Sequence, residues 1–168
     1  LPFRQDEQVR AVIQTRNFEE AQYLLFATKN GIVKKTALEE YNTPLKADGI
    51  IAIKMREGDE LVAVRHISAG DDVLLVSRKG QAIRFSEKDA RAMGRATEGV
   101  RGMALRGDDE VITAEIARDD MDLLVVTDNG YGKRTRVSEY PRKGRGGMGV
   151  KTAQLTEAKG KLAGARVV

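Results

Sequence analysis

The chain has 168 residues, of which 41% are hydrophobic and 32% charged, and its formal net charge is +4. It contains no cysteine and one histidine, which excludes a disulfide framework, a thiolate metal cluster and a cysteine nucleophile, and favours a reducing cytoplasm. The sequence has no apolar run near the roughly 18 residues of a membrane span and no signal-peptide pattern at its start. We expect a soluble, cytoplasmic piece of a longer chain.

The N-terminal stretch, residues 1–22, offers one strand-like run. Asp6–Ile13 has the same character as the later run Asp59–Val64, in which an acidic turn leads into an apolar strand. We interpret residues 1–22 as the end of a repeat that precedes the others.

The next segment, residues 23–71, begins with a predicted hairpin. Its purely apolar run Leu24–Ala27 is typical of a strand buried on both faces. Asn30–Gly31 then predicts a two-residue turn, because such turns require residues that accept positive φ. The return strand carries two cations, Lys34 and Lys35, which are the first candidate binding residues.

A long connection leads from this hairpin to two further strand-like runs. They are Ile50–Met55 and Leu61–Ile67, joined by the tight polar turn Arg56–Asp59. We predict that these two runs pair with each other as the third and fourth strands of the unit.

The same order of elements occurs twice more, in residues 72–121 and 122–168. The turn glycines Gly31, Gly80 and Gly130 lie about 50 residues apart. A second set of glycines keeps the same spacing: Gly49, Gly99 and Gly149. Four strands in each repeat are typical of a bladed all-β array, and three repeats form an arc, because propellers usually close with about 4–8 blades. We therefore predict one all-β domain whose blades follow these repeats.

Cations and carboxylates are separated within each repeat. In residues 72–121 the cations fill the hairpin return and the long connection, whereas carboxylates fill the last turn and the link to the next repeat. Equivalent positions of a radial array lie on equivalent edges, so the cations predict a basic rim suited to a nucleic acid. Any single cation fits an ordinary solvated surface equally well. The candidate contacts are Lys34, Lys35, Arg84, Arg91, Arg95, Arg101, Lys133, Arg134, Arg136 and Lys151.

The third repeat contains a glycine-arginine loop, residues 141–149. Its cations are Arg142, Lys143 and Arg145, and its glycines are Gly144, Gly146, Gly147 and Gly149. Glycines let a backbone approach a phosphate, and arginine supplies forked donors. The loop lacks the spacing of a nucleotide-binding loop, and a plain flexible connection is the alternative. With 5% aromatic residues and no tryptophan, contact with a duplex backbone is favoured over stacking on single strands.

Other candidate sites give simpler interpretations. His66 has no partner cluster in the sequence, and we interpret it as structural. The acidic segments 58–60 and 108–110 lack calcium-loop spacing and are interpreted as hairpin turns. Tyr41 and Tyr140 lack the surroundings of a tyrosine nucleophile and are interpreted as packing residues. We expect no metal site and no catalytic residue in this chain.

Several groups of residues occur in one order along the chain: Gly31–Thr36, Ile83–Ser86, Arg91–Gly94 with Gly99–Gly102, Asn129–Thr135 and Glu139–Pro141. In that order they resemble the C-terminal domain of the A subunit of bacterial DNA gyrase, and the resemblance covers the whole chain. It implies a six-bladed β-pinwheel, a propeller-like disc whose blades exchange strands. This chain would form a partial arc: the end of blade two, blades three and four, and most of blade five.

The resemblance also implies a function. The chain would be a non-catalytic, DNA-wrapping module of an ATP-dependent type II topoisomerase, which binds duplex DNA around its basic rim so that the enzyme introduces negative supercoils. Its implied partners are double-stranded DNA, the remainder of the gyrase A subunit, and the gyrase B subunit in an A2B2 complex, at the bacterial nucleoid. ATP and Mg²⁺ would be held elsewhere in the holoenzyme, and no cofactor is expected here.

One loop departs from the family pattern. The family's signature box, Gln-Arg-Arg-Gly-Gly-Lys-Gly, belongs to the first blade, which this chain does not include. The segment Lys143–Gly149 resembles the box at Arg145, Gly146, Gly147 and Gly149, and differs at Lys143, Gly144 and Met148. It is either a second, degenerate box or a supporting loop. Two alternatives stay open: the C-terminal domain of the topoisomerase IV A subunit, which directs DNA-segment selection, and a propeller-like platform for protein partners.

Overall fold

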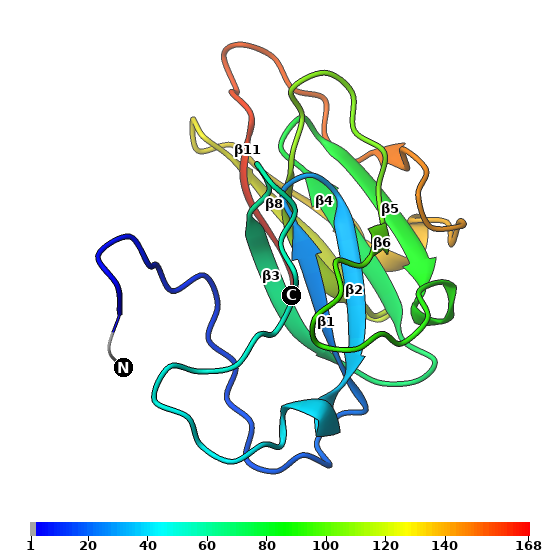
Figure 1. Cartoon of the computed structure of the whole chain (residues 1–168). Helices are drawn as coiled ribbons and strands as arrows, with labels where there is room; N and C mark the ends of the chain where they lie inside the picture. Colours follow the sequence, from blue (N-terminus) through cyan, green and yellow to red (C-terminus); the bar gives the residue numbers. More distant parts are fainter. Residues whose placement is uncertain (1–2) are drawn as a thin grey trace.

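Three antiparallel sheets follow one another in the computed structural model, which describes residues 3–168 (Figure 1). The first sheet contains β1 (Tyr23–Thr28), β2 (Ile32–Ala37), β3 (Leu61–Ile67) and β6 (Val100–Arg101). The second contains β4 (Asp72–Ser77), β5 (Gln81–Ser86), β7 (Val111–Ala117) and β10 (Val150–Lys151). The third contains β8 (Asp122–Thr127), β9 (Gly132–Arg136) and β11 (Leu162–Val167). Each return strand runs into a short 3-10 helix: η1 (Leu38–Tyr41), η2 (Glu87–Asp89) and η3 (Val137–Glu139).

The predicted hairpins are present in all three repeats. The apolar runs form β1, β4 and β8, which lie inside their sheets with a strand on either side. The turn glycines Gly31, Gly80 and Gly130 have φ values of 88°, 91° and 86°, which a residue with a Cβ adopts only at a cost. Every residue of β4 is buried, as expected for a strand covered on both faces. The predicted all-β array is therefore confirmed.

The edge strands are exchanged between repeats. β6 belongs to the second repeat but pairs with β2 of the first, and β10 of the third repeat pairs with β5 of the second. The prediction that Ile50–Met55 pairs with Leu61–Ile67 is wrong, since the first run forms no strand and β3 pairs with β1. By analogy with β6 and β10, the first run would need a return strand from an earlier repeat, and the described residues supply none.

The segment at the N-terminus also differs from its prediction. Asp6–Ile13 forms no strand, and its side chains are exposed except for the half-buried Ile13. In Figure 1 this segment, in dark blue, runs outside the sheets. A strand needs a hydrogen-bonded neighbour, and the described part of the chain places none beside it. The blade boundaries proposed from the repeats stay predictions.

Two apolar clusters fill the spaces between successive sheets. The first includes Leu25, Leu75 and Phe85, and the second includes Leu74, Leu123 and Leu162. Leu74 and Leu75 are neighbours in β4 and point to opposite faces, so the middle sheet contributes to both clusters. The strands β3, β7 and β11 contact one another in succession, which leaves β6 and β10 at the opposite edge of their sheets.

Glycines allow the exchanged strands to dock. A Cβ on Gly99 would overlap the carbonyl oxygen of Val33, and a Cβ on Gly149 would overlap that of Ala82. Both glycines also have positive φ, at 99° and 73°. The second glycine of each of these repeats thus marks the point where the chain reaches the neighbouring sheet.

Candidate nucleic-acid interface

Equivalent cations lie on the exchanged edge strands. Arg101 is the second residue of β6 and pairs in register with Ile32, while Lys151 is the second residue of β10 and pairs with Gln81. Both side chains are exposed. Within residues 3–168, neither forms an ion pair with a carboxylate. Each of these two sheets therefore presents one exposed cation without a carboxylate partner, at the equivalent position of its edge strand.

The two connecting loops that precede these strands are docked in the same way. Here loop 2 denotes residues 90–99, and loop 3 denotes residues 141–149. In loop 2 the Met93 amide donates to the carbonyl of Lys35 at 2.8 Å, and in loop 3 the Lys143 amide donates to that of Arg84 at 2.8 Å. Loop 2 exposes Arg91 and loop 3 exposes Lys143, and neither is paired with a carboxylate in the described region. Each loop thus adds one free cation near the edge strand.

The arginines of loop 3 bind the protein itself. Arg142 contacts both carboxylate oxygens of the buried Asp72, at 3.0 Å from Nε and 2.8 Å from Nη2. Arg145 donates from Nε to the carbonyl of Asp89 at 3.0 Å and from Nη1 to that of Arg101 at 2.7 Å. These contacts hold the loop against Asp72 of the second sheet, against η2 and against β6 of the first sheet. They leave Lys143 as its cation without a carboxylate or carbonyl partner among the described residues.

Three predicted contact residues on the return strands are buried or half-buried and bonded to other groups of the protein. The Lys34 residue is 1% exposed, and its Nζ lies 2.7–3.1 Å from three backbone carbonyl oxygens. Lys35 Nζ lies 2.6 Å from Glu87 Oε2 and above the ring of Tyr23. Arg84 lies between Asp72 at 2.8 Å and Asp119 at 2.6 Å. These side chains are enclosed by the fold, so we do not include them in the proposed interface.

The surroundings of these groups shift their titration. Burial lowers the pKa of Lys34 to about 8, although the charge of Glu40 opposes the effect. Burial alone would raise the pKa of Glu87, but the hydrogen bonds from Lys35 and from the Gly70 amide outweigh it and lower that pKa. The hydrogen bond from Arg84 lowers the pKa of Asp119. Glu87 and Asp119 are therefore held as carboxylates.

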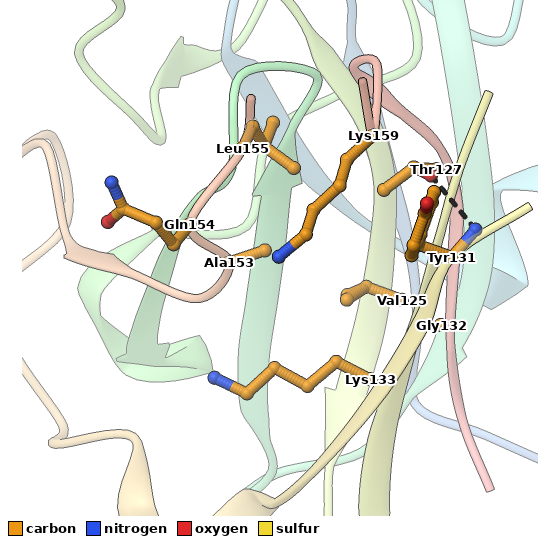
Figure 2. A pocket seen from close by; sticks show the side chains of 9 residues that line it. All are labelled: Val125, Thr127, Tyr131, Gly132, Lys133, Ala153, Gln154, Leu155 and Lys159. Atoms are coloured by element: carbon orange, nitrogen blue, oxygen red, sulfur yellow. Dashed lines mark hydrogen bonds between the residues drawn. The ribbon is translucent and has the colours of Figure 1, made fainter. Parts of the chain in front are cut away.

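The third sheet is open at its outer edge. Its order is β11-β8-β9, and among the described residues no further strand covers β9. Arg134 and Arg136 are exposed but both contact Asp122, whereas Lys133 donates from Nζ to the carbonyl of Thr152 at 3.2 Å. A hollow of about 280 Å³ lies beside β9. Figure 2 shows Lys133 and Lys159 directed across this hollow toward the segment that contains Ala153.

The structure thus divides the predicted contacts by their environment. The exposed cations without a carboxylate partner among residues 3–168 are Arg91, Arg101, Lys133, Lys143 and Lys151. Arg134, Arg136 and Arg142 are exposed and Arg145 is half-buried, and contacts with the protein anchor all four. Arg95 is half-buried, and its Nη1 has no hydrogen-bond partner in the described region. The charge pattern of the sequence did not single out Asp72 and Asp122, although both begin the central strand of their repeats, a recurrence that could have revealed them.

The loop glycines of repeat three have different roles. Gly149 allows the close approach to Ala82, and the Gly146 amide donates to the carbonyl of Gly102 at 2.8 Å with φ at 92°. The Gly147 carbonyl accepts from the Ala104 amide at 2.9 Å. Gly144 is exposed, and a Cβ at this residue would meet no atom of the described chain within 4 Å. The backbone of this loop is therefore largely fixed by β5 and by the segment that follows β6.

The remaining candidates take part in structural contacts. His66 Nε2 lies 3.0 Å from Thr15 Oγ1, and the Asp59 and Asp109 carboxylates accept hydrogen bonds from the amides of neighbouring hairpin turns. Tyr140 is buried in the second apolar cluster. Residues 3–168 contain no group of three or more His, Cys, Asp or Glu side chains placed to hold a metal ion. None of the helices described is long and apolar enough to cross a membrane.

Comparison with known proteins gives consistent matches over the chain. The family model of the DNA gyrase C-terminal domain, a beta-propeller, matches residues 22–68, 71–118 and 122–168. The DNA gyrase A subunit from Mycolicibacterium smegmatis is 48% identical over 170 residues, which cover 100% of this chain and 20% of that protein. The chain thus spans a small part of its curated relatives.

Two solved structures share the fold. The C-terminal domain of a DNA topoisomerase IV matches with a TM-score of 0.89 and 27% identity, covering 100% of this chain and 53% of that one. A DNA gyrase A C-terminal domain matches with a TM-score of 0.87 and 26% identity, covering 100% of this chain and 56% of that one.

Proposed function

The chain belongs to the DNA gyrase C-terminal domain family, and on that premise we propose that it is a non-catalytic module that wraps duplex DNA for a type II topoisomerase. The observation that carries the proposal is the repetition of free cations at the outer edge of successive sheets, Arg101 on β6 and Lys151 on β10. A polyanion that follows this edge meets a positive charge at each sheet. Counterion release from each neutralised phosphate then favours binding.

The contacts are expected to read the DNA backbone and not its bases. The free cations stand on short edge strands and loops, and the described residues place no helix long enough to enter a major groove. Arg91 and Lys143 widen the basic edge beside the two strands, and Lys133 extends it to the third sheet. Binding through phosphates fixes the path of the duplex and gives little sequence preference.

The finer parts of the proposal concern the whole enzyme. We place the wrap in a gyrase that introduces negative supercoils, with the remainder of the A subunit, the B subunit, ATP and Mg²⁺ outside this chain. The 48% identity to a gyrase A subunit supports gyrase over topoisomerase IV. The bacterial relative also supports a site of action on chromosomal DNA in the bacterial cytoplasm.

The test removes the two cations of the edge strands and compares the effect on duplex binding with that of removing two cations elsewhere. In the double variant Arg101→Ala with Lys151→Ala, duplex affinity should fall, and the slope of log affinity against log salt should flatten by about two units, roughly 0.9 for each lost phosphate contact. The matched control is Arg118→Ala with Arg166→Ala. Both control residues lie away from β6 and β10, one after β7 and one on β11, on the other side of their sheets.

Fluorescence anisotropy with two duplexes of unrelated sequence measures both quantities. The control pair loses the same net charge and should change the slope by less than the edge pair. Equal slopes for the wild type and the edge variant would contradict the proposed interface.

A further inference from the structure

The side chain of Lys34 is enclosed by three backbone carbonyl groups. Its Nζ lies 2.7 Å from the oxygen of Ala52, 3.1 Å from that of Gly94 and 2.7 Å from that of Arg95. An ammonium group has three N–H donors, so all of them are used. Ala52 belongs to the first repeat, whereas Gly94 and Arg95 belong to loop 2 of the next repeat. One buried cation therefore joins β2 to two separate segments.

This arrangement is costly and specific. A buried ammonium is tolerated only when its donors are satisfied, since an unpaired buried charge is strongly destabilising. The ring of Phe26 lies 5.3 Å from Nζ and adds a cation–π contact. Of the charged groups nearby, Glu40 favours the ammonium form and Arg95 disfavours it. Tyr41 donates its hydroxyl to the same Ala52 carbonyl at 2.8 Å.

The enclosed carbonyls lie between two proposed DNA contacts. Gly94 and Arg95 follow Arg91 in loop 2 and precede Arg101 on β6. The same stretch is closed on itself by the Thr97 hydroxyl, which donates to the Gly94 carbonyl at 2.7 Å. Movement of the Gly94–Arg95 backbone would therefore move the chain that leads to both exposed arginines.

The fold does not require a cation at this position. The residue that follows the turn at the same register is Lys34 in β2, Ile83 in β5 and Lys133 in β9. The second sheet accommodates isoleucine there, and loop 3 above it is held by its own arginines instead. Lys133 repeats one contact of Lys34, because it bonds the Thr152 carbonyl as Lys34 bonds that of Ala52. An apolar substitute for Lys34 should thus fold.

We propose that Lys34 is a positioning residue for DNA binding: its ammonium group fixes loop 2 of the following repeat, so that Arg91 and Arg101 face the duplex. The proposal rests on the proposed function, because it assigns Lys34 an indirect role in the same interface. Lys34 itself is too deeply buried to touch a phosphate.

The test begins with Lys34→Met, which keeps an unbranched side chain, one atom shorter, and removes the donors. Duplex affinity should fall by about threefold to tenfold. This range is expected for a residue that acts on binding through a neighbouring contact, and it is smaller than the loss expected if the hydrophobic core were disrupted. Amide hydrogen exchange should accelerate in loop 2 and stay unchanged in β4 and in β8. Exchange that accelerates throughout the sheets would overturn the proposal in favour of a general structural role.

A double-mutant cycle separates positioning from other effects. Lys34→Met combined with Arg91→Ala and Arg101→Ala should weaken binding no further than the two arginine substitutions do. Combined with Lys133→Ala on β9 of the third sheet, its effect should be additive. Additivity with the arginine pair would overturn the inference.

A chemical rescue uses the absence of cysteine from this chain. Lys34→Cys is treated with bromoethylamine while unfolded and then refolded, which restores an ammonium group at that site alone. Affinity should return toward the wild-type value, and a failure of refolded, aminoethylated protein to regain it would count against the proposal. If Arg91→Ala with Arg101→Ala leaves affinity unchanged, the proposed function fails; if only Lys34→Met leaves it unchanged, the inference alone fails.

Discussion

Loop 2 and loop 3 occupy the same place in successive repeats but are fastened differently. Both dock through matching backbone hydrogen bonds, from Met93 to Lys35 and from Lys143 to Arg84. Loop 2 is then held from beneath by Lys34, whereas loop 3 is held from within by Arg142 and Arg145. A basic residue in this array therefore either holds a connecting loop in place or is free to bind the proposed DNA partner. Its exposure and its ion pairs determine which of these two roles it has.

The largest expected effect breaks both loops in the same manner. Gly149→Ala places a methyl group against the Ala82 carbonyl at a positive φ, and Gly99→Ala does the same at Val33. We expect each to lower the free energy of unfolding by about 4 kcal/mol, because the edge strand must move away. Urea denaturation measures the loss.

The control for these substitutions is Gly58→Ala. Gly58 also has positive φ, at 74°, but a Cβ there meets nothing within 4 Å. Its cost should be limited to backbone strain of about 1 kcal/mol. A similar loss at all three glycines would show that strain, and not the close docking, dominates.

The next substitution should break the fastening of loop 3 alone. Asp72→Ala removes the carboxylate that Arg84 and Arg142 share, and Asp72 is buried. Leaving Arg84 without this partner should cost about 3 kcal/mol of unfolding free energy. Hydrogen exchange should accelerate in loop 3 and not in loop 2. Asp119→Ala is the control, because solvent screens this exposed partner of Arg84 and its loss should cost much less than the loss of Asp72.

A series of stability measurements at different pH values tests the buried charge of Lys34, at the position that Ile83 occupies in the second sheet. The pKa of Lys34 falls from an ordinary 10.5 to about 8 in the folded protein, so between those values the unfolded chain binds more protons than the native one. The contribution of Lys34 to stability should therefore rise as pH increases from about 8 to 10.5. The wild type should gain stability relative to Lys34→Met across this window, as measured by urea midpoints. Burial raises the pKa of the neighbouring Tyr41.

The smallest effect on stability is expected at the free cation of loop 3. Lys143→Ala should change the free energy of unfolding by less than about 0.5 kcal/mol, because the side chain is exposed and unpaired within the described residues. It should nevertheless flatten the salt dependence of duplex binding by about one unit. Arg142→Ala should show the opposite balance, with a clear loss of stability and a smaller change in slope. Identical profiles for the two variants would remove the distinction between free and anchored cations.

Much of the fold could be predicted from the sequence because its signals are local. Asn30–Gly31 and Asn129–Gly130 define hairpins within a few residues, and the apolar run of β4 indicates burial on both faces. The exchange of β6 and β10 could not be predicted from the residues alone. The pattern of residues indicates that a segment is extended, but it does not indicate which strand that segment pairs with. The wrong pairing of Ile50–Met55 follows from that limit.

The candidate site was less predictable, for a related reason. Lys34 and Lys133 have the same position in their repeats, yet one is enclosed and the other exposed. The difference arises because loop 2 covers β2, whereas the described residues place no such loop over β9. Whether a lysine meets solvent or a carbonyl cage thus depends on a segment about 60 residues away in the chain. Repetition in the sequence showed where the cations recur but not which of them are covered.

The exchange of edge strands gives the array a direction. When the third repeat unfolds, β10 leaves with it, and β5 loses its outer neighbour while the rest of the second sheet stays formed. When the first hairpin unfolds, β6 loses its partner but the ladder of β4, β5 and β7 is untouched. Local opening should therefore spread backward along the chain more readily than forward. In hydrogen-exchange experiments, the protection of β2 should therefore depend on whether the second repeat is folded. The protection of β5 should depend in the same way on the third repeat.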